Sequence, residues 1–367
     1  MGLVSYLGVL ETAPRLGPRV VWGTIVVAVA GFAVAPVLLS HDVYSYVDYA
    51  RLGMVHDLDP YVNPPTAAPA DSAFAHVTWP NTTSAYGPLF TLLTYPLAWM
   101  SLGAAVATLK ALSAMSVLAL AAIVARLSPM RGIDPLRAAA FVALNPLVAV
   151  HVVGGAHNDS LAMLPAMAAV AAVLTARPAT GGAGLLAAAA TKTSTLFVAP
   201  FALLGAARQR GCNAFDRYYL QNALHLGRFL VGAAAAAAAI GALAYIAFGW
   251  DWLHSFGLAG ENQSRTSYMS VPITAARLSG QDPDAVRIAA LTMYAALLAC
   301  LLVWTWRGGD WIRAAAWAAF GLLLATSWLL PWYLIWALPL AALSRDRLLQ
   351  LLLLALTAFQ LGARIPL

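Results

Sequence analysis

A carboxylate and several aromatic side chains stand close together in a polar segment near the start of the chain. If residues 42–53 form a helix, Asp42, Tyr46 and Tyr49 lie on one face, because they are spaced at i, i+4 and i+7. Tyrosine rings pack against the C–H faces of sugars, and a carboxylate can take the proton of a hydroxyl group. The spacing therefore fits either carbohydrate chemistry or an interfacial helix with an aromatic belt and a solvated acid.

Three further groups of polar side chains have two interpretations each. Lys192 interrupts an apolar run, where a lysine at mid-membrane costs about 2.5–3.5 kcal/mol, so it either binds an anionic group or extends to the nearer head groups. Residues 157–159 (His-Asn-Asp) either contact a substrate or cap the helix that follows. Arg265 either clamps a phosphate or pairs with Glu261 at i, i+4.

The composition predicts the elements that must position these groups. The chain has 367 residues, of which 61% are hydrophobic and only 10% are charged, with a mean hydropathy of +0.75. A soluble domain carries about 25% charged residues, so soluble, collagen-like and disordered classes are excluded. At about 20 residues per span, we expect an all-α polytopic membrane protein with about eleven transmembrane helices or half-helices.

The apolar runs and the charges predict an orientation. Two long polar loops, residues 40–87 and 249–285, contain nine of the fifteen acids but only three of the 21 lysines and arginines. Because basic residues favour the cytoplasmic side, both loops are expected on the opposite, extracytoplasmic face. The net charge of +6 therefore reflects orientation, and no nucleic-acid partner is expected. The apolar runs lie near residues 20–39, 88–107, 108–125, 138–153, 160–176, 182–206, 229–248, 286–305, 314–329, 331–343 and 348–363.

Hydropathy leaves the path of two runs open. If residues 88–107 and 108–125 both cross the membrane, residues 157–159 lie on the cytoplasmic side, whereas a half-membrane hairpin places them on the face that holds Asp42. We favour the hairpin. The run 182–206 can likewise form two half-helices, because residues 191–194 interrupt it. Residues 207–228, with aromatic residues among arginines, are expected to form a cytoplasmic surface helix.

The order of several short motifs resembles a known family, the GT-C mannosyltransferases that use polyprenyl-phosphate-mannose. In particular it resembles the actinobacterial α-1,6-mannosyltransferases of lipoglycan synthesis, which are related to glycosyltransferase family 87. The similar motifs are residues 42–46 (DVYSY), 59–61 (DPY), 86–88 (YGP), 145–146 (NP), 154–159 (GGAHND) and 331–333 (PWY), with Trp336.

The resemblance implies a single GT-C domain over residues 1–367 that transfers mannose with inversion from a polyprenyl-phosphate donor to a mannan- or lipoglycan-type acceptor. Asp42 occupies the position of the general base, and Lys192 and Arg265 are expected to bind the donor phosphate. Substrate contacts are expected from Tyr44, Tyr46, Asp48, Arg51, Tyr86, His157, Asn158 and Asp159.

The same resemblance places the protein in the inner membrane of a bacterium, as a multi-pass enzyme with its site facing the extracytoplasmic side. No cofactor is expected, since the donor carries no nucleotide, and the histidine spacing fits no zinc motif, so no divalent metal is predicted. The alternatives are a GT-C transferase of arabinose or glucose, a lipid-linked-sugar transporter or flippase, and a non-catalytic scaffold that would tolerate Asp42→Ala.

Overall fold

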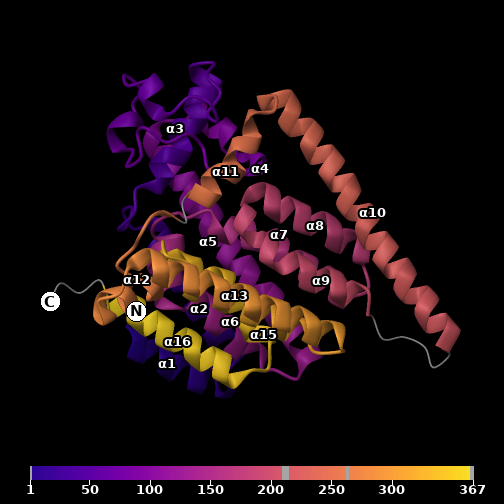
Figure 1. The fold of residues 1–367 in the computed structure, drawn as a ribbon. Helices are drawn as coiled ribbons and strands as arrows, with labels where there is room; N and C mark the ends of the chain where they lie inside the picture. The colour runs from indigo at the N-terminus through magenta and orange to yellow at the C-terminus, as the bar shows by residue number, and fades with distance from the viewer. Residues whose placement is uncertain (1, 209–214, 262–263, 364–367) are drawn as a thin grey trace.

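The computed structural model describes residues 2–208, 215–261 and 264–363, and within these ranges the chain forms helices and loops without a strand (Figure 1). The expected surface helix at 207–228 lies partly outside the described residues. The α-helices are α1 (Leu3–Thr12), α2 (Pro18–Val34), α3 (Asp42–Val55), α4 (Pro88–Thr94), α5 (Leu102–Leu127), α6 (Pro135–Ala143), α7 (Asp159–Leu174), α8 (Pro178–Thr191), α9 (Ala199–Ala206), α10 (Phe215–Phe248), α11 (His254–Glu261), α12 (Val271–Ser279), α13 (Pro283–Trp306), α14 (Trp311–Ala325), α15 (Leu338–Leu343) and α16 (Arg347–Gly362).

Short helical turns connect these helices. They are the 3-10 turns η1 (Ala13–Arg15), η2 (Pro65–Ala67), η3 (Phe74–His76), η4 (Tyr95–Trp99), η5 (Ser128–Arg131), η7 (Thr193–Val198), η8 (Asp251–Leu253) and η10 (Pro331–Trp336), and the π-helical turn η6 (Val148–Val153). Figure 1 places α3 and the loop that follows it at one end of the molecule, and α1 and α16 at the opposite end.

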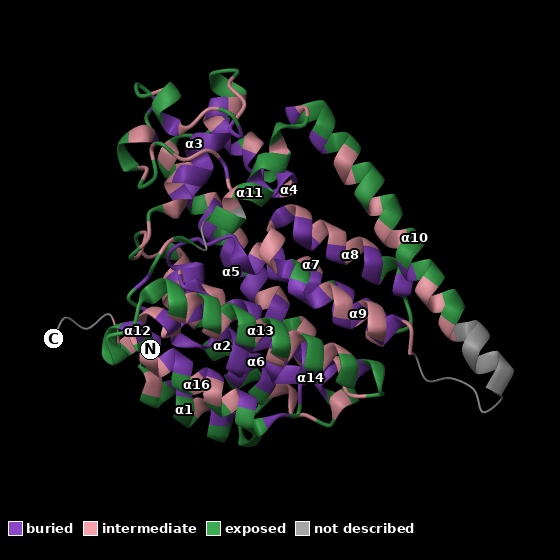
Figure 2. Cartoon of the chain, in the orientation of Figure 1, coloured by how far each residue is buried: buried purple, intermediate pink, exposed green. Residues whose placement is uncertain are grey.

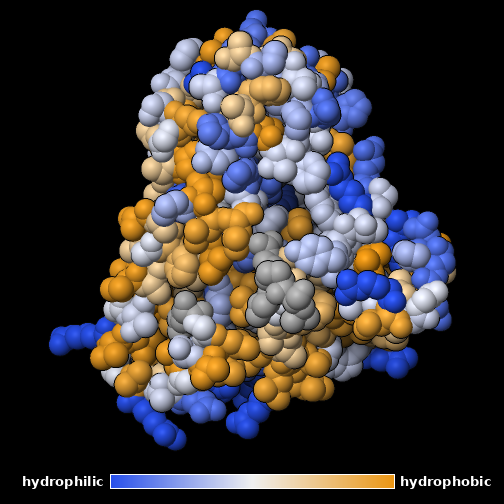
Figure 3. Space-filling view, turned by 90° about the vertical axis from the view of Figure 1, so that its left-hand side faces the viewer, coloured by the Kyte–Doolittle hydropathy of each residue, from blue (hydrophilic) through white to orange (hydrophobic). Residues whose placement is uncertain are grey.

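Within the part of the chain that the structure describes, three helices are long and apolar enough to cross a membrane: Leu102–Arg131, Asn222–Phe248 and Pro283–Trp306. Six shorter apolar helices of 10–17 residues accompany them. Figure 3 shows hydrophobic side chains over much of the middle and lower part of one face, with hydrophilic side chains projecting at the lower edge. These features indicate a membrane protein; the expected total of about eleven spans and half-spans stays a prediction.

The buried core is built from the inner helices. Figure 2 shows mostly buried residues along α5, α6 and α7 and mostly exposed ones along α10 and α13. The contact between α8 and α10 depends on small residues: a Cβ atom on Gly182 would lie 2.1 Å from the carbonyl oxygen of Phe229, and one on Gly232 would lie 2.0 Å from that of Ala179. Such close backbone approach is a common way for membrane helices to pack.

The first ambiguous region contains one helix that is long enough to cross a membrane, rather than two. Residues 88–99 form the short α4 and η4, and α5 is the single long helix that follows. Ser101 caps α5 by accepting a hydrogen bond from the backbone N–H of Ala104 at 3.4 Å. At about 1.5 Å per residue, residues 88–99 are too few to cross a membrane, which favours the half-membrane arrangement.

The second ambiguous region is divided at a lysine. α8 ends at Thr191, Lys192 has an extended backbone, and η7 and α9 continue the chain. The run 182–206 is therefore two shorter helices that meet at Lys192. This break places a lysine at the end of α8 that faces the first polar loop, where the backbone N–H of Gly87 donates to the carbonyl oxygen of Thr191 at 3.2 Å.

Candidate functional site

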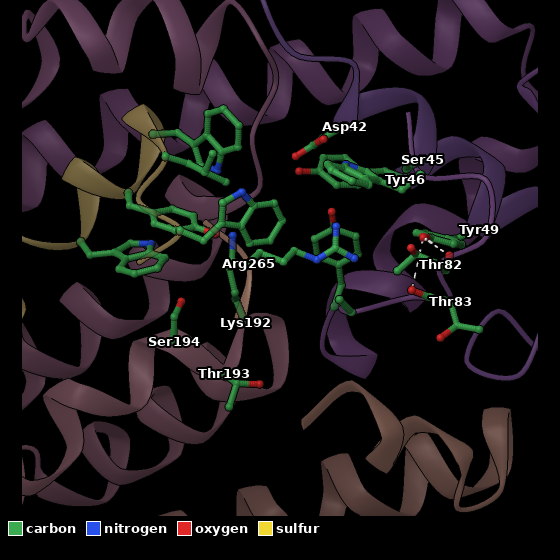
Figure 4. Close-up of a pocket in the computed structure, with 18 residues that line it drawn as sticks. Asp42, Ser45, Tyr46, Tyr49, Thr82, Thr83, Lys192, Thr193, Ser194 and Arg265 are labelled. Atoms are coloured by element: carbon green, nitrogen blue, oxygen red, sulfur yellow. Dashed lines mark hydrogen bonds between the residues drawn. The ribbon is translucent and has the colours of Figure 1, made fainter. Parts of the chain in front are cut away.

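A cavity of about 150 Å³ lies between α3 and the ends of the helices beneath it (Figure 4). One wall is formed by the face of α3 that carries Asp42, Tyr46 and Tyr49, together with residues 79–86 of the first loop. The other walls are formed by residues 192–194 at the α8 break, by Arg265, and by aromatic residues between positions 328 and 336. Segments from five distant parts of the chain therefore meet at one hollow.

Asp42 is the first residue of α3 and is the carboxylate on the wall of this cavity. Its Oδ2 atom lies 3.7 Å from Nδ1 of His157, and its side chain is 19% exposed. Burial raises the pKa of Asp42 to about 6, the positive charge of Lys192 opposes this rise, and the negative charge of Asp159 adds to it. A carboxylate with a pKa near neutrality is suited to accept a proton during a reaction.

Asp42 also faces a second, adjacent cavity. This cavity has a volume of about 250 Å³ and is lined by His41 and Thr78 as well as Asp42. Besides Asp42, four residues line both cavities and form their common wall: Trp79, Trp328, Leu330 and Trp332. The carboxylate of Asp42 is thus accessible to groups that approach from either cavity.

Lys192 contributes one positive charge to the first cavity. Its Nζ atom donates to Oδ1 of Asp159 at 2.7 Å and to Oδ1 of Asn158 at 3.3 Å. The same ammonium group lies 5.4 Å from the ring centre of Tyr333 and 5.8 Å from that of Trp336, which are cation–π distances. The lysine is therefore held in place on one side while its cavity side stays open.

Asp159 is fully buried and does not line the cavity. Besides the bond from Lys192, its Oδ1 atom accepts a hydrogen bond from Nε1 of Trp336 at 2.7 Å. A buried carboxylate needs such partners to compensate for lost hydration. The sequence left two roles open for Asp159, substrate contact and helix cap, and the geometry adds a third. Asp159 is the first residue of α7 and holds the ammonium group of Lys192 in place.

His157 lies beside Asp42 on a constrained piece of backbone. Its ring stacks on Trp332 with ring centres 3.6 Å apart and an interplanar angle of 15°. The preceding residue, Ala156, has a φ of +56°, which is strained for a residue with a Cβ atom. Strain of this kind costs about 1–3 kcal/mol and clusters at functional sites. Because Nδ1 of His157 lies 3.7 Å from Oδ2 of Asp42, residues 157–159 and Asp42 lie on the same side of the molecule.

Arg265 supplies the second positive charge on the cavity wall. Its guanidinium carbon lies 4.7 Å from the ring centre of Trp79 and 5.1 Å from that of Trp328. Within the described part of the chain Arg265 forms no ion pair, so the pairing with Glu261 considered from the sequence is not seen. Two indole rings hold its side chain instead, with the positive charge available at the cavity.

The aromatic face of α3 is packed against the first loop. The ring of Tyr46 meets the rings of Tyr86 and Phe90 edge to face, each with ring centres 4.9 Å apart. The hydroxyl of Tyr49 donates to the carbonyl oxygen of Thr82 at 2.7 Å, which Figure 4 shows as a dashed line. These contacts fix the position of α3 relative to the loop, and they leave Tyr46 and Tyr86 on the cavity wall.

The neighbouring face of α3 lies away from the cavity. The ring of Tyr44 stacks on His76, with ring centres 4.9 Å apart. Arg51 donates to Asp71 at 2.8 Å and to the carbonyl oxygen of Ala98 at 2.8 Å. Asp48 is buried, and its pKa is raised to about 7 by burial and by the charge of Asp71. Tyr44, Asp48 and Arg51, expected as substrate contacts, thus do not line this cavity.

Some lining residues were not predicted as site residues. Trp332 and Tyr333 belong to a segment that the sequence analysis noted only as a family motif, and Trp328 was not noted there. All three line the cavity. The signal present was a dense run of aromatic residues between positions 328 and 336. For metal binding, the described residues contain no cluster of three or more histidine, cysteine or acidic side chains that could hold an ion.

Comparison with known proteins finds a family profile and a relative whose names give the same activity. Residues 3–208, more than half of the chain, match the family profile described as "Alpha-(1->6)-mannopyranosyltransferase, N-terminal domain". The chain is also 28% identical over 374 aligned residues to alpha-(1->6)-mannopyranosyltransferase A of Mycobacterium tuberculosis, covering 93% of this chain and 68% of that protein. No solved structure matches the chain significantly.

Proposed function

The chain belongs to the alpha-(1->6)-mannopyranosyltransferase family, and on that basis we propose that it transfers mannose from a polyprenyl-phosphate donor to a mannan- or lipoglycan-type acceptor. The observation that carries this proposal is the lining of one cavity: the carboxylate of Asp42 and the positive charges of Lys192 and Arg265 face the same space. A transfer from a phosphate ester needs both a proton acceptor and positive partners for the leaving group.

In the proposed reaction Asp42 is the general base. An acceptor hydroxyl attacks C1 of the mannosyl group while Asp42 removes its proton. The new oxygen–C1 bond forms as the bond between C1 and the phosphate oxygen breaks, and the polyprenyl phosphate leaves with the electron pair. Because a single displacement inverts C1, an α-linked product requires a β-linked donor.

Lys192 and Arg265 are proposed to stabilise the phosphate that leaves. Both cations are held by partners that do not occupy the cavity: Lys192 by Asp159 and Asn158, and Arg265 by two indole rings. Fixed charges of this kind stabilise developing negative charge without having to reorganise during the reaction. Of the predicted substrate contacts, Tyr46 and Tyr86 are positioned to pack against a sugar in this cavity.

The proposed location is the inner membrane of a bacterium, with a GT-C arrangement of many spans and the site on the extracytoplasmic side. The distribution of charge supports this orientation. The ends of helices opposite α3 carry arginines such as Arg126, Arg177 and Arg307, and basic residues favour the cytoplasmic face. No cofactor or metal is part of the proposed reaction.

The test uses purified protein in lipid vesicles with polyprenyl-phosphate-mannose and a short mannoside acceptor. We expect transfer by the wild type and at least about a hundredfold loss in Asp42→Asn. Asp57→Asn is the matched control, because Asp57 is exposed in the same loop and lies outside the cavity. Its positive φ of 55° also suits asparagine.

Parallel reactions with polyprenyl-phosphate-linked arabinose or glucose test the donor sugar. Transfer of only those sugars would replace mannose in the proposal. Equal activity in Asp42→Asn and the wild type would remove Asp42 from the mechanism. Movement of the intact lipid-linked sugar across the bilayer without transfer would favour a flippase.

A further inference from the structure

A groove of about 480 Å³ lies at the end of the molecule opposite α3, where α1, α6 and α16 meet (Figure 1). Three arginines from distant parts of the chain line it: Arg15, Arg137 and Arg347. Leu351 and Leu354 of α16 also line it, one and two turns after Arg347, and give the groove an apolar part. The groove is separate from the candidate active site, and the proposed reaction does not use it.

The charge of this groove is not balanced by the protein. All three arginines are exposed, and none of them forms an ion pair within the described ranges. Among the residues that the structure describes, Glu11 is the single acid on the groove wall. By contrast, Arg313 at the same end of the molecule is paired with Asp346 at 2.7 Å. The groove therefore presents an excess of positive charge.

The leucines that line the groove belong to an apolar helix with exposed side chains. Leu351 is 62% exposed, and α16 is one of the short apolar helices. An exposed leucine one turn away from a charged helix start is suited to contact hydrocarbon chains while the guanidinium groups stay at head-group level. The positive-inside rule explains why arginines occur at this end. It does not explain why three of them converge on one groove with an apolar part.

We propose that this groove binds an anionic phospholipid of the membrane, with its phosphate against Arg15, Arg137 and Arg347 and an acyl chain along Leu351 and Leu354. Basic pockets between helices on the cytoplasmic side are a recognised way to bind anionic head groups. Arginine suits this role because its planar guanidinium can bind phosphate oxygens in pairs.

The experiment measures lipid binding to the full chain in detergent by native mass spectrometry, with phosphatidylglycerol as the probe and phosphatidylcholine as the zwitterionic comparison. We expect preferential binding of phosphatidylglycerol and about a tenfold or greater loss of affinity in the triple variant Arg15→Gln/Arg137→Gln/Arg347→Gln. The matched control is Arg126→Gln/Arg177→Gln/Arg307→Gln, which removes the same charge from exposed arginines outside the groove. Its affinity should stay within about twofold.

Equal losses in the two triple variants, or no loss in either, would overturn the proposal, because binding would then reflect general surface charge or another site. Displacement of the lipid by excess inorganic phosphate would also overturn it, since the ligand would then be a free phosphate. Leu351→Gln gives a second test that leaves the charge of the groove unchanged: this exposed position should tolerate the neutral polar side chain, and lipid binding should fall. Unchanged binding there would remove the acyl-chain contact. Unfolding temperatures without lipid verify that each variant is folded.

Discussion

The Nζ atom of Lys192 lies 2.7 Å from Oδ1 of Asp159, a carboxylate with no exposed surface. The same oxygen accepts a hydrogen bond from Trp336. When one partner of a buried ion pair is removed, the other charge is left uncompensated. The position of Lys192 in the cavity therefore depends on Asp159, which makes Asp159 a positioning residue in the proposed reaction.

This dependence predicts that Asp159 and Lys192 act as a unit. Lys192→Gln is expected to lower kcat/KM for mannosyl transfer by about a hundredfold, because a fixed charge at the leaving phosphate is lost. Asp159→Asn is expected to cause a similar loss although it does not line the cavity. In the double variant the loss of kcat/KM should be about the same as in either single variant, because both changes remove the same interaction.

The measurement is a double-mutant cycle on initial rates, with unfolding temperatures as the control for folding. If the loss of kcat/KM in the double variant equals the product of the losses in the two single variants, Asp159 does not act by positioning Lys192. That result would mean that Asp159 contributes to transfer separately from Lys192, as it would if it contacted the substrate.

The raised pKa of Asp42 predicts how activity depends on pH. A general base must be deprotonated, so kcat/KM should rise about tenfold per pH unit below a pH of about 6 and level off above it. Because the charge of Lys192 lowers the pKa of Asp42, the residual activity of Lys192→Gln should reach its plateau at a higher pH. Rates measured from pH 4 to 8 on a substrate without titratable groups check both expectations. An acidic limb at the same pH in Lys192→Gln would show that Asp42 is not the group that titrates.

The sequence predicted which segments are helical better than it predicted where one helix ends and the next begins. Apolar runs fix where helices form, and the break at Lys192 was visible as a polar interruption. The division between α4 and α5 was not visible in the same way, because apolar residues continue through residues 88–107. The two helices are separated by the 3-10 turn η4, by residues 100–101 and by the cap that Ser101 forms.

The candidate site was predictable where its residues are close in sequence. Helical periodicity correctly placed Asp42, Tyr46 and Tyr49 on one face of the helix, but it could not determine that this face lines a cavity. The placement of Arg265 between two tryptophans joins segments that are far apart along the chain. Periodicity contains no information about contacts of that range.

Asp48 predicts an effect on stability rather than on transfer. It is buried, its Oδ2 atom has no hydrogen-bond partner among the described residues, and burial and Asp71 raise its pKa to about 7. At pH values between the ordinary pKa of an aspartate and about 7, Asp48 is mostly deprotonated in the unfolded chain and mostly protonated in the folded protein. Stability contributed by the protonated form is therefore lost as pH rises through this window.

Asp48→Asn removes this titration and keeps a neutral side chain of similar size. Its unfolding temperature, followed by tryptophan fluorescence, should exceed that of the wild type at pH 8 and match it more closely at pH 5. Transfer activity should remain within about threefold of the wild type, since Asp48 does not line the cavity. A large loss of activity with unchanged stability would restore Asp48 as a substrate contact.

A close backbone contact between the first loop and α8 gives the last prediction. A Cβ atom on Gly87 would lie 2.1 Å from the carbonyl oxygen of Ala190, so Gly87→Ala must displace the end of α8. Lys192 follows two residues later, and a shift of about 1 Å in a positioning group can cost about a hundredfold in rate. We expect a loss of kcat/KM of about tenfold to a hundredfold and a lower unfolding temperature. Gly103→Ala is the control, since a Cβ atom there meets open space. Wild-type rates in Gly87→Ala would mean that the loop moves without carrying Lys192 with it, and that this contact does not set the geometry of the site.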